Sequence, residues 1–222
     1  MPTSHFSQVQ DICGLIFYLD PGSMLDIGCG FGKYGFLARE YLEVWDVRFK
    51  PGRWNRRIEA IEGFAECLTP AHKFIYDQVH VGNALEILPK LAGPYDLVLL
   101  IDALEHFERS DGLETLRQCR RLGRNVIVST PHRVSRQGEV FGNPFEQHRS
   151  KWTRADLAPF GPACFVPHDD SLIALLGEGA DMIARTLRYQ RVRRFVRRYV
   201  PFLKFVYRRM RERGGISPRA DA

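Results

Sequence analysis

The sequence predicts an α/β protein whose core is a doubly wound, mostly parallel sheet of seven strands. Five apolar runs of strand length alternate with segments of helical character, which is typical of parallel strands buried on both faces. Two more runs flank the turn-forming stretch 167–171 and predict a hairpin that adds an antiparallel last strand. The 222 residues, 45% hydrophobic and 26% charged, suit one globular domain with an appendage.

The elements are expected to follow one another in a regular order along the chain. The predicted strands are 24–27, 58–61, 79–81, 97–101, 126–129, 164–166 and 172–176, and the clearest helices between them are 34–41, 85–91 and 112–122. Residues 133–162 are rich in Gly, Pro and polar residues and lack periodicity, so we interpret them as a substrate loop. Residues 41–57 exceed a minimal connection, and with 137–152 they are expected to form a lid over the acceptor.

The positive charge is concentrated near the C-terminus. The formal net charge is +6, but residues 185–213 hold twelve Lys or Arg and one acid, so the rest of the chain is mildly acidic. We therefore expect a domain at 1–184 and a basic amphipathic helical extension at 185–222, interrupted at Pro201. Its apolar stripe favours an anionic membrane surface over a nucleic-acid backbone, and packing on the domain or a second subunit stays open. The stripe consists of Tyr189, Val192, Phe195, Val196, Tyr199 and Val200.

Cysteine usage and the N-terminus indicate the compartment. Five scattered cysteines without a Cys-x-x-Cys pair argue against a disulfide framework or a thiolate zinc site. The first ten residues lack the basic start and apolar run of a signal peptide. The apolar run at 12–19 is shorter than the roughly 20 residues that a membrane span needs. We expect a cytoplasmic protein, with peripheral contact at the inner membrane surface through the extension.

A glycine-rich loop follows the first predicted strand. Asp26 ends the strand, and Gly28, Gly30 and Gly32 lead into a helix, with Cys29 inside the loop. Glycines allow the backbone to approach a ligand, and a helix N-terminus offers free N–H groups. The third Gly comes one residue earlier than in the dinucleotide pattern, and the acid suits a ligand with a cationic amine. The alternative is a tight turn without a ligand.

Over about residues 23–177 this pattern resembles the class I S-adenosylmethionine-dependent methyltransferases, which have a Rossmann-like fold. The resemblance implies that Asp26 and the glycine backbone hold the methionine part of S-adenosylmethionine, and that Glu62 bridges the ribose hydroxyls. Asn83 stands where the family has Asp in a Gly-Asp-Ala adenine contact. Solvated loop positions are the alternative for Glu62 and Asn83. The expected cofactor-binding residues are Asp26, Gly28, Cys29, Gly30, Gly32, Glu62, Asn83, Ala84 and Asp102.

A second group of polar residues follows the fourth predicted strand. If a helix begins there, Asp102, Glu105 and His106 share one face. The pattern is similar to ubiquinone-biosynthesis O-methyltransferases and to small-RNA 2′-O-methyltransferases, in which a later His before a Trp-Thr-like element completes a magnesium site. That resemblance implies Mg²⁺ ligation by Asp102, Glu105, His106 and His148, where Asp102 replaces the usual Glu. A metal-free base at His106 or His148 and a structural role are the alternatives; Glu105, His106 and His148 are the catalytic candidates.

These residues predict an enzyme rather than a binding module. We expect a methyltransferase that uses S-adenosylmethionine to O-methylate a small-molecule, glycan or lipid-linked acceptor. An RNA 2′-O-methyltransferase is the first alternative, although no RNA-binding module precedes the core and the main domain is not basic. A non-catalytic binding protein with a cofactor fold is the second. The sequence does not fix the oligomeric state.

Overall fold

The computed structural model describes residues 4–133, 137–139 and 142–213. The chain divides into two compact units, Met1–Ile183 and Ala184–Ala222. The first unit contains the whole sheet, and the second belongs to one long helix and the residues that follow it. Each unit is described by itself.

The sheet has seven strands in the order β3-β2-β1-β4-β5-β7-β6. The first five strands in the chain run parallel, and β7 is antiparallel to both β5 and β6. The strands are β1 (Ser23–Ile27), β2 (Arg57–Glu62), β3 (Gln78–Val81), β4 (Tyr95–Ile101), β5 (Gly123–Pro131), β6 (Ala163–Val166) and β7 (Ser171–Gly177). The predicted fold class, with its antiparallel last strand, is confirmed.

The helices between the strands are mostly short. The α-helices are α1 (Val9–Leu19), α2 (Lys33–Arg39), α3 (Pro70–Ile75), α4 (Ala84–Ile87), α5 (Arg109–Leu122), α6 (Arg154–Leu157) and α7 (Ala180–Arg213). Single 3₁₀ turns lie at Phe6–Gln8, Pro51–Arg53, Ala65–Cys67, Leu88–Lys90, Leu104–His106, Pro144–Glu146 and Ala158–Phe160, and a π-helical turn at Glu40–Val44 extends α2. The condition for placing Asp102, Glu105 and His106 on one helix face is not met, because a 3₁₀ turn at Leu104–His106 follows β4 and α5 begins only at Arg109.

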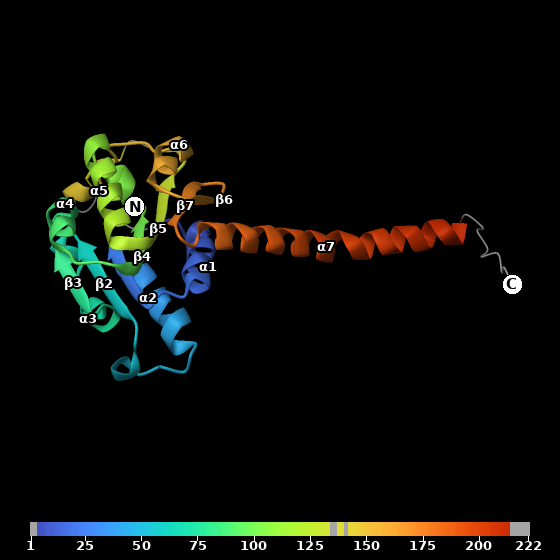
Figure 1. The fold of residues 1–222 in the computed structure, drawn as a ribbon, viewed down its shortest axis with the longest axis horizontal. Helices are drawn as coiled ribbons and strands as arrows, with labels where there is room; N and C mark the ends of the chain where they lie inside the picture. The colour runs from blue at the N-terminus through green and yellow to red at the C-terminus, as the bar shows by residue number, and fades with distance from the viewer. Residues whose placement is uncertain (1–3, 134–136, 140–141, 214–222) are drawn as a thin grey trace. The chain divides into compact units, whose positions relative to one another are not determined.

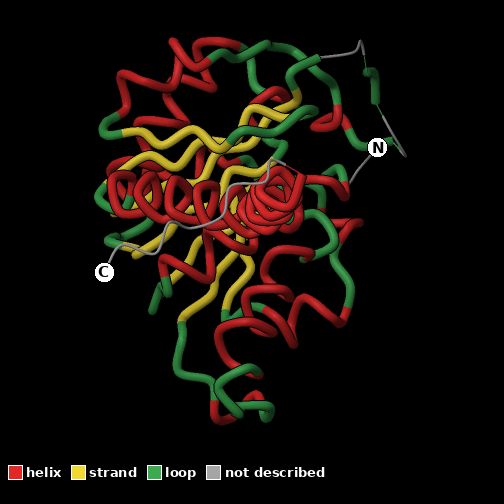
Figure 2. Tube along the Cα trace, turned by 90° about the vertical axis from the view of Figure 1, so that its right-hand side faces the viewer, coloured by secondary structure: helices red, strands yellow, loops and turns green. Residues whose placement is uncertain are grey.

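Both faces of the sheet are buried, as a doubly wound fold requires. Along β4, Val98 and Leu100 belong to one hydrophobic cluster together with residues of α5, whereas the equally buried Leu97 and Leu99 lie outside that cluster. This alternation follows from the two-residue period of a strand. Helices α1, α2 and α3 contact one another in sequence, and α4 contacts α5. The sheet lies between helical layers in both views (Figure 1, Figure 2).

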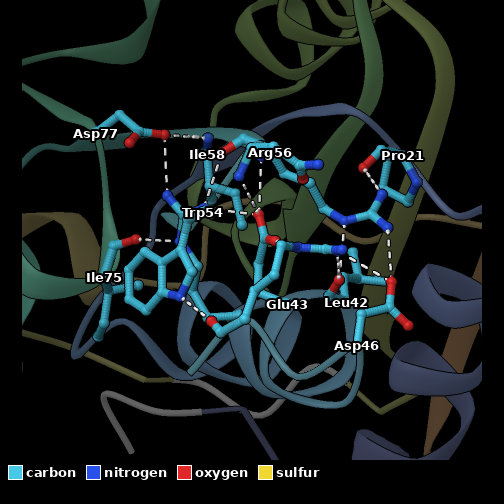
Figure 3. Close-up of polar contacts among 12 residues, drawn as sticks. Pro21, Leu42, Glu43, Asp46, Trp54, Arg56, Ile58, Ile75 and Asp77 are labelled. Carbon is cyan, nitrogen blue, oxygen red and sulfur yellow. Dashed lines mark hydrogen bonds and ion pairs between the residues drawn. The ribbon is translucent and has the colours of Figure 1, made fainter. Parts of the chain in front are cut away.

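The connection from α2 to β2 is tied down at the amino ends of the strands. Glu43 is fully buried, and its Oε1 accepts hydrogen bonds from the backbone N–H groups of Asn55 (3.1 Å) and Arg56 (2.8 Å). Arg56 also donates to the carbonyl of Pro21, just before β1 (2.9 Å) (Figure 3). None of the residues 41–57 lines the pocket at the other edge of the sheet. The expectation that they form a lid is therefore wrong.

The second unit continues the helix α7. Its backbone is helical through Arg213, without the interruption expected at Pro201. In the part with described side chains, Tyr189, Val192 and Phe195 are exposed. None of the helices described is both long enough and apolar enough to cross a membrane.

Candidate functional site

A pocket of about 950 Å³ lies at the carboxyl edge of the parallel strands. This is the edge at which open α/β sheets bind ligands. Among the predicted cofactor-binding residues, those that line it are Asp26, Gly28, Cys29, Gly30, Glu62, Asn83, Ala84 and Asp102, whereas Gly32 does not. Glu105, His106 and His148 line the same pocket. The structure thus brings both predicted groups of polar residues into one cavity.

The glycine loop is bent by its own backbone conformation. Gly28 has φ +72°, and a Cβ there would lie 3.2 Å from Cβ of Ala103, so the position has neither the conformation nor the room for a larger residue. Glu62 fixes the loop from β2, because its carboxylate accepts from the N–H of Gly30 at 2.8 Å and from that of Phe64 at 2.9 Å. A carboxylate has about four lone-pair sites, so Glu62 keeps acceptor capacity toward the pocket.

Asp26 lies below the loop on β1 and is 2% exposed. Its Oδ2 accepts a hydrogen bond from the hydroxyl of Tyr76 at 2.7 Å. Burial raises the pKa of Asp26 to about 6, a rise that the Tyr76 hydrogen bond opposes. Nearby, Nε2–H of His72 donates to the carbonyl of Gly30 at 2.7 Å. Sequence analysis missed Tyr76 and His72, because both belong to α3 and its end and lie more than 40 residues from the motif they support.

Asn83 begins helix α4. Its Oδ1 accepts from the N–H of Leu85 at 3.0 Å, which makes it the N-cap residue. The next residue, Ala84, is buried and packs into the core cluster. The amide oxygen has a second lone pair, so the capping bond and a ligand bond are compatible.

Asp102 ends β4 with φ +47°, an uncommon conformation for a residue with a side chain. Its Oδ1 accepts from Ser129 Oγ at 2.7 Å, and its Oδ2 accepts from the amide of Gln8. Burial raises the pKa of Asp102. Gln8 is fully buried and belongs to an N-terminal segment without a recognisable motif, which is why sequence analysis did not find it.

Glu105, His106 and His148 form a compact cluster, in which one ligand atom of each lies within 4.8 Å of the others. Asp102, expected as a fourth ligand, is not part of this group, and both of its oxygens accept hydrogen bonds, from Gln8 and Ser129. The two imidazole rings are 5.0 Å apart between centroids. His106 Nδ1 lies 3.2 Å from the carbonyl oxygen of Gln147. The carbonyl can only accept, so Nδ1 carries the proton and the lone pair is on Nε2.

The electrostatics of the cluster follow from burial. Glu105 is 2% exposed, and its Oε2 has no hydrogen-bond partner among the described residues. Burial, with the nearby charge of Asp102, raises the pKa of Glu105 to about 8. Burial lowers the pKa of His106 to about 4, so its imidazole is neutral at neutral pH. Strongly shifted groups in a cleft are typical of functional sites.

The second half of the predicted substrate loop holds His148 in place. The backbone N–H groups of Arg149 and Ser150 both donate to the carbonyl of Glu105, at 2.8 and 3.1 Å. Trp152 is buried and donates from Nε1 to the carbonyl of Leu104 at 3.2 Å. Residues 134–136 and 140–141 of the loop lie outside the described part. Trp152 packs against α5. The described loop residues that line the pocket are Arg133, Gln137, Asn143, Pro144, Phe145, Glu146, His148 and Arg149.

An N-terminal segment, residues 4–8, forms one wall of the pocket. Lys33 Nζ donates to the carbonyl of Ser4 at 2.7 Å, and Ser7 Oγ donates to Asp170 at 3.0 Å. Ser4 and His5 line the cavity. The sequence carries no signal for this contact, which joins the start of the chain to the loop before β7.

Known proteins match this chain in sequence and in fold. A family model described as a methyltransferase domain matches residues 11–193. Norajmaline N-methyltransferase from Rauvolfia serpentina is 32% identical over 117 residues, which are 51% of this chain and 37% of that protein. The chain therefore covers little more than a third of this relative's length.

Solved structures share the fold at low sequence identity. The N-terminal domain of EvdMO1, in the presence of SAH and D-fucose, aligns with TM-score 0.54 and 16% identity over 79% of this chain and 84% of that chain. A putative O-methyltransferase from Nostoc punctiforme aligns with TM-score 0.53 and 19% identity over 75% of this chain and 55% of that chain. Because the family model covers most of the sequence, and the motifs and the sheet order agree with it, the chain belongs to the class I S-adenosylmethionine-dependent methyltransferases.

Proposed function

We propose that this protein is a methyltransferase that uses S-adenosylmethionine and methylates an oxygen of a small-molecule, glycan or lipid-linked acceptor. One observation carries the proposal. A single pocket joins the glycine loop and Glu62 to the cluster of Glu105, His106 and His148. The first group suits a nucleoside with a charged amino acid part, and the second suits the activation of a hydroxyl. The SAH bound to similar structures supports the cofactor.

In the proposed complex, the amino acid, ribose and adenine parts of the cofactor each bind a side chain of this chain. The Asp26 carboxylate lies beside the loop and attracts the cationic amine of the methionine part. Glu62, already held by Gly30 N–H, accepts from both ribose hydroxyls. The amide oxygen of Asn83 accepts from the adenine amino group.

His106 is the proposed general base. Its Nδ1–H is held by the carbonyl of Gln147, which orients the ring and leaves the Nε2 lone pair for a proton. The acceptor hydroxyl gives its proton to Nε2, and its oxygen attacks the sulfonium methyl group. The C–O bond forms as the C–S bond breaks, and the electron pair of that bond stays on sulfur, which becomes the neutral thioether of S-adenosylhomocysteine. His148 and Glu105 position the acceptor beside this base.

The same three side chains also fit a divalent cation. Two imidazole nitrogens and a carboxylate oxygen of Glu105 lie within 4.8 Å of one another, and Oε2 of Glu105 has no hydrogen-bond partner among the described residues. Nδ1 of His106 is already oriented by a carbonyl, as in metal-binding histidines. Mg²⁺ prefers oxygen ligands, whereas nitrogen-rich sets suit Mn²⁺, Fe²⁺ or Zn²⁺. As the alternative to the base role of His106, we therefore propose that Glu105, His106 and His148 are ligands for such a cation, which would lower the pKa of an acceptor hydroxyl when bound.

Cofactor binding is the first test. Isothermal titration with S-adenosylhomocysteine is expected to show one site. Glu62→Ala is expected to weaken it about 10-fold or more, because two charge-assisted hydrogen bonds are lost. Glu66→Ala, which removes an exposed acid nearby, is the matched control and leaves the affinity unchanged. No binding by the wild type overturns the proposal.

Methyl transfer is the second test. S-adenosylmethionine with a labelled methyl group is supplied with extracts separated into polar small molecules, glycans, lipids and RNA. Transfer of the labelled methyl group to a hydroxyl-bearing small molecule, glycan or lipid-linked compound, in a form that is stable to alkali, supports the proposed acceptor class. Label found in RNA alone favours the 2′-O-methyltransferase alternative.

Metal binding is tested separately. Titration of the wild type with Mn²⁺ and with Mg²⁺ is expected to show heat with Mn²⁺ that His148→Ala abolishes. Asp102→Asn retains the heat, because Asp102 lies outside the cluster. Absence of heat with either ion contradicts metal ligation and leaves the metal-free base.

For the extension at 185–213, we propose peripheral contact with an anionic membrane. Twelve basic residues against one acid, with Tyr189, Val192 and Phe195 exposed on the described part of the helix, support it. Co-sedimentation of the full chain with anionic vesicles tests it. Replacing Arg191, Arg194 and Arg198 by Gln is expected to reduce binding, and replacing Arg117 and Arg121 of α5 is the control. Binding that does not depend on the tail arginines contradicts the proposal.

A further inference from the structure

We infer that the connection between α2 and β2 is a second lipid-contacting surface, which inserts aromatic side chains into an anionic bilayer. It is called the amino-edge loop and comprises residues 41–57. The inference does not depend on the proposed enzymatic function, because this loop does not line the pocket.

The loop exposes large apolar side chains at alternate positions. Trp45 is 71% exposed, Val47 73% and Phe49 63%. Burial of such side chains in the protein would be the ordinary outcome, since large apolar side chains are stabilised when they leave water. Three large apolar side chains are thus exposed within five residues, which favours an interaction surface.

The base of the loop holds these side chains outward. Arg48 Nη2 donates to the carbonyl of Leu42 at 2.7 Å and to Asp46 at 3.0 Å, and the carbonyl of Arg48 accepts from the Trp54 indole at 2.8 Å. Glu43 accepts from Arg48 as well. Glu43 and Arg48 are therefore engaged at the base of the loop, whereas Trp45, Val47 and Phe49 stay exposed. Figure 3 shows the network around Glu43 and Leu42.

The backbone at the tip supports the same conclusion. Val47 has φ +64°, the left-handed region that a β-branched side chain adopts only under constraint. The conformation keeps Val47 exposed between Trp45 and Phe49. In both views the chain between α2 and β2 extends beyond the end of the sheet (Figure 1, Figure 2).

Charge points to an anionic lipid surface as the partner. Residues 41–57 hold five Arg or Lys and two acids, and both acids, Glu43 and Asp46, are paired with Arg48. Outside the extension, by contrast, the chain has an excess of acids. Lys50 and Arg53 are exposed in the same loop. A Trp that enters the interface, with basic side chains reaching anionic head groups, is the usual composition of a peripheral membrane contact.

Because residues 185–222 contain no tryptophan, fluorescence of Trp45 reports lipid contact of the amino-edge loop and not of the extension. The full chain has three tryptophans, and Trp152 is buried while Trp54 is tied into the network. Vesicles of anionic phospholipids with brominated acyl chains quench only indoles that enter the bilayer. We expect quenching in the wild type, its loss in Trp45→Phe and its retention in Trp152→Phe. If the chain binds but Trp45→Phe leaves the quenching unchanged, or if none occurs, the inference is overturned.

Affinity provides the second measurement. Trp45→Ser combined with Phe49→Ser is expected to weaken binding to anionic vesicles about tenfold or more, since two inserted aromatic groups are lost. Lys50→Gln with Arg53→Gln is expected to weaken it about fivefold per charge. Phe17→Ser with Val81→Ser, exposed residues outside the loop, is the matched control. Affinity for S-adenosylhomocysteine stays unchanged in all three, because none of these residues lines the pocket.

Self-association is the competing outcome. Sedimentation velocity without lipid is expected to give the same sedimentation coefficient for the wild type and for Trp45→Ser combined with Phe49→Ser. If the wild type is a dimer that this variant dissociates, and Trp45 is not quenched by lipid, the loop binds a second copy of the chain and the lipid inference is overturned.

Discussion

The two edges of the sheet each bury a glutamate and treat it in opposite ways. At the amino edge, Glu43 is fully buried, and Arg39, Arg48 and two backbone N–H groups surround its oxygens. At the carboxyl edge, Glu105 is 2% exposed, and one of its oxygens has no hydrogen-bond partner among the described residues. Burial therefore raises the pKa of Glu105 to about 8.

The contrast separates two uses of a buried carboxyl group. A carboxylate enclosed by guanidinium groups and N–H donors completes a network that ties the chain together, and breaking such a network is costly. A buried carboxyl group that has an oxygen without a hydrogen-bond partner lowers the stability of the fold, but that oxygen can bind a ligand or a metal ion beside the two imidazoles. The polar network at the amino edge thus stabilises the fold, whereas the carboxyl edge has a polar atom that lacks a hydrogen-bond partner within the described part of the chain and is available to a ligand.

The largest expected effect is on activity at the carboxyl edge. His106→Ala is expected to lower kcat for methyl transfer by about 10²–10⁴-fold, the usual contribution of a general base. Steady-state rates with the identified acceptor measure it, and the KM for S-adenosylmethionine is expected to change little. His80→Ala, on β3 outside the pocket, is the control. A rate within twofold of wild type for His106→Ala would assign the base elsewhere.

Substitution of Glu43 at the amino edge is expected to change the stability of the protein rather than its activity. Glu43→Ala removes the acceptor of the Arg48 guanidinium and of two backbone N–H groups, whereas Arg39 keeps its ion pair with Asp77. The substitution is expected to lower the free energy of unfolding by about 3–5 kcal/mol. Chemical denaturation measures it. Glu114→Ala, which breaks the exposed pair with Arg117, is the control and is expected to leave the free energy of unfolding nearly unchanged, because water screens this pair. If Glu43→Ala also weakens S-adenosylhomocysteine binding in the folded fraction, the two edges are coupled, which contradicts a purely stabilising role of the amino edge.

Local patterns made most of the fold and part of the site predictable. Apolar runs of strand length coincide with the seven strands, because strands buried on both faces need apolar side chains throughout. The glycine loop was predictable because its spacing is short and its backbone demands are specific, whereas Glu62, which lies 32 residues after Gly30, was predictable only through the family resemblance. The cluster of Glu105 and His106 with the distant His148 was predictable only through the family resemblance.

Long-range polar pairing was not predictable. Tyr76 binds Asp26 from 50 residues away, and Gln8 binds Asp102 from 94 residues away, so no local pattern marks either pair. The lid expected at 41–57 was wrong for the same reason, because the burial of Glu43 depends on Arg39 and Arg56 meeting it in space. A sequence shows that these residues are charged but not which of them are enclosed.

The pH dependence of stability tests the carboxyl edge further. Burial holds the pKa of Asp26 at about 6, above its ordinary 3.8, so the folded state prefers the protonated form. The stability from this group is complete below about pH 4 and is lost as the pH rises through 6. Relative to Asp26→Asn, the wild type is expected to lose about 3 kcal/mol between pH 4 and 7. Denaturation at several pH values measures it, with the exposed Asp181→Asn as control. Parallel curves for wild type and Asp26→Asn contradict the assignment.

The smallest expected effect concerns Asn83, which caps helix α4 and is also proposed to bind the cofactor. Asn83 caps α4, so Asn83→Ala is expected to cost about 1 kcal/mol of unfolding free energy, whereas Asn83→Ser keeps a capping oxygen and costs less. Thr153→Ala removes the cap of α6, outside the pocket, and gives the matched cost without a ligand effect.

Cofactor affinity then decides what Asn83 does beyond capping. A serine hydroxyl bonded to the helix N-terminus is shorter than the amide and does not reach an adenine amino group, so Asn83→Ser is expected to weaken S-adenosylhomocysteine severalfold, by one neutral hydrogen bond. Asn83→Asp keeps both the cap and an acceptor oxygen, and its affinity is expected to equal or exceed that of the wild type. If Asn83→Ser binds as tightly as the wild type, this residue serves only the helix, and even at the carboxyl edge one polar group belongs to the scaffold.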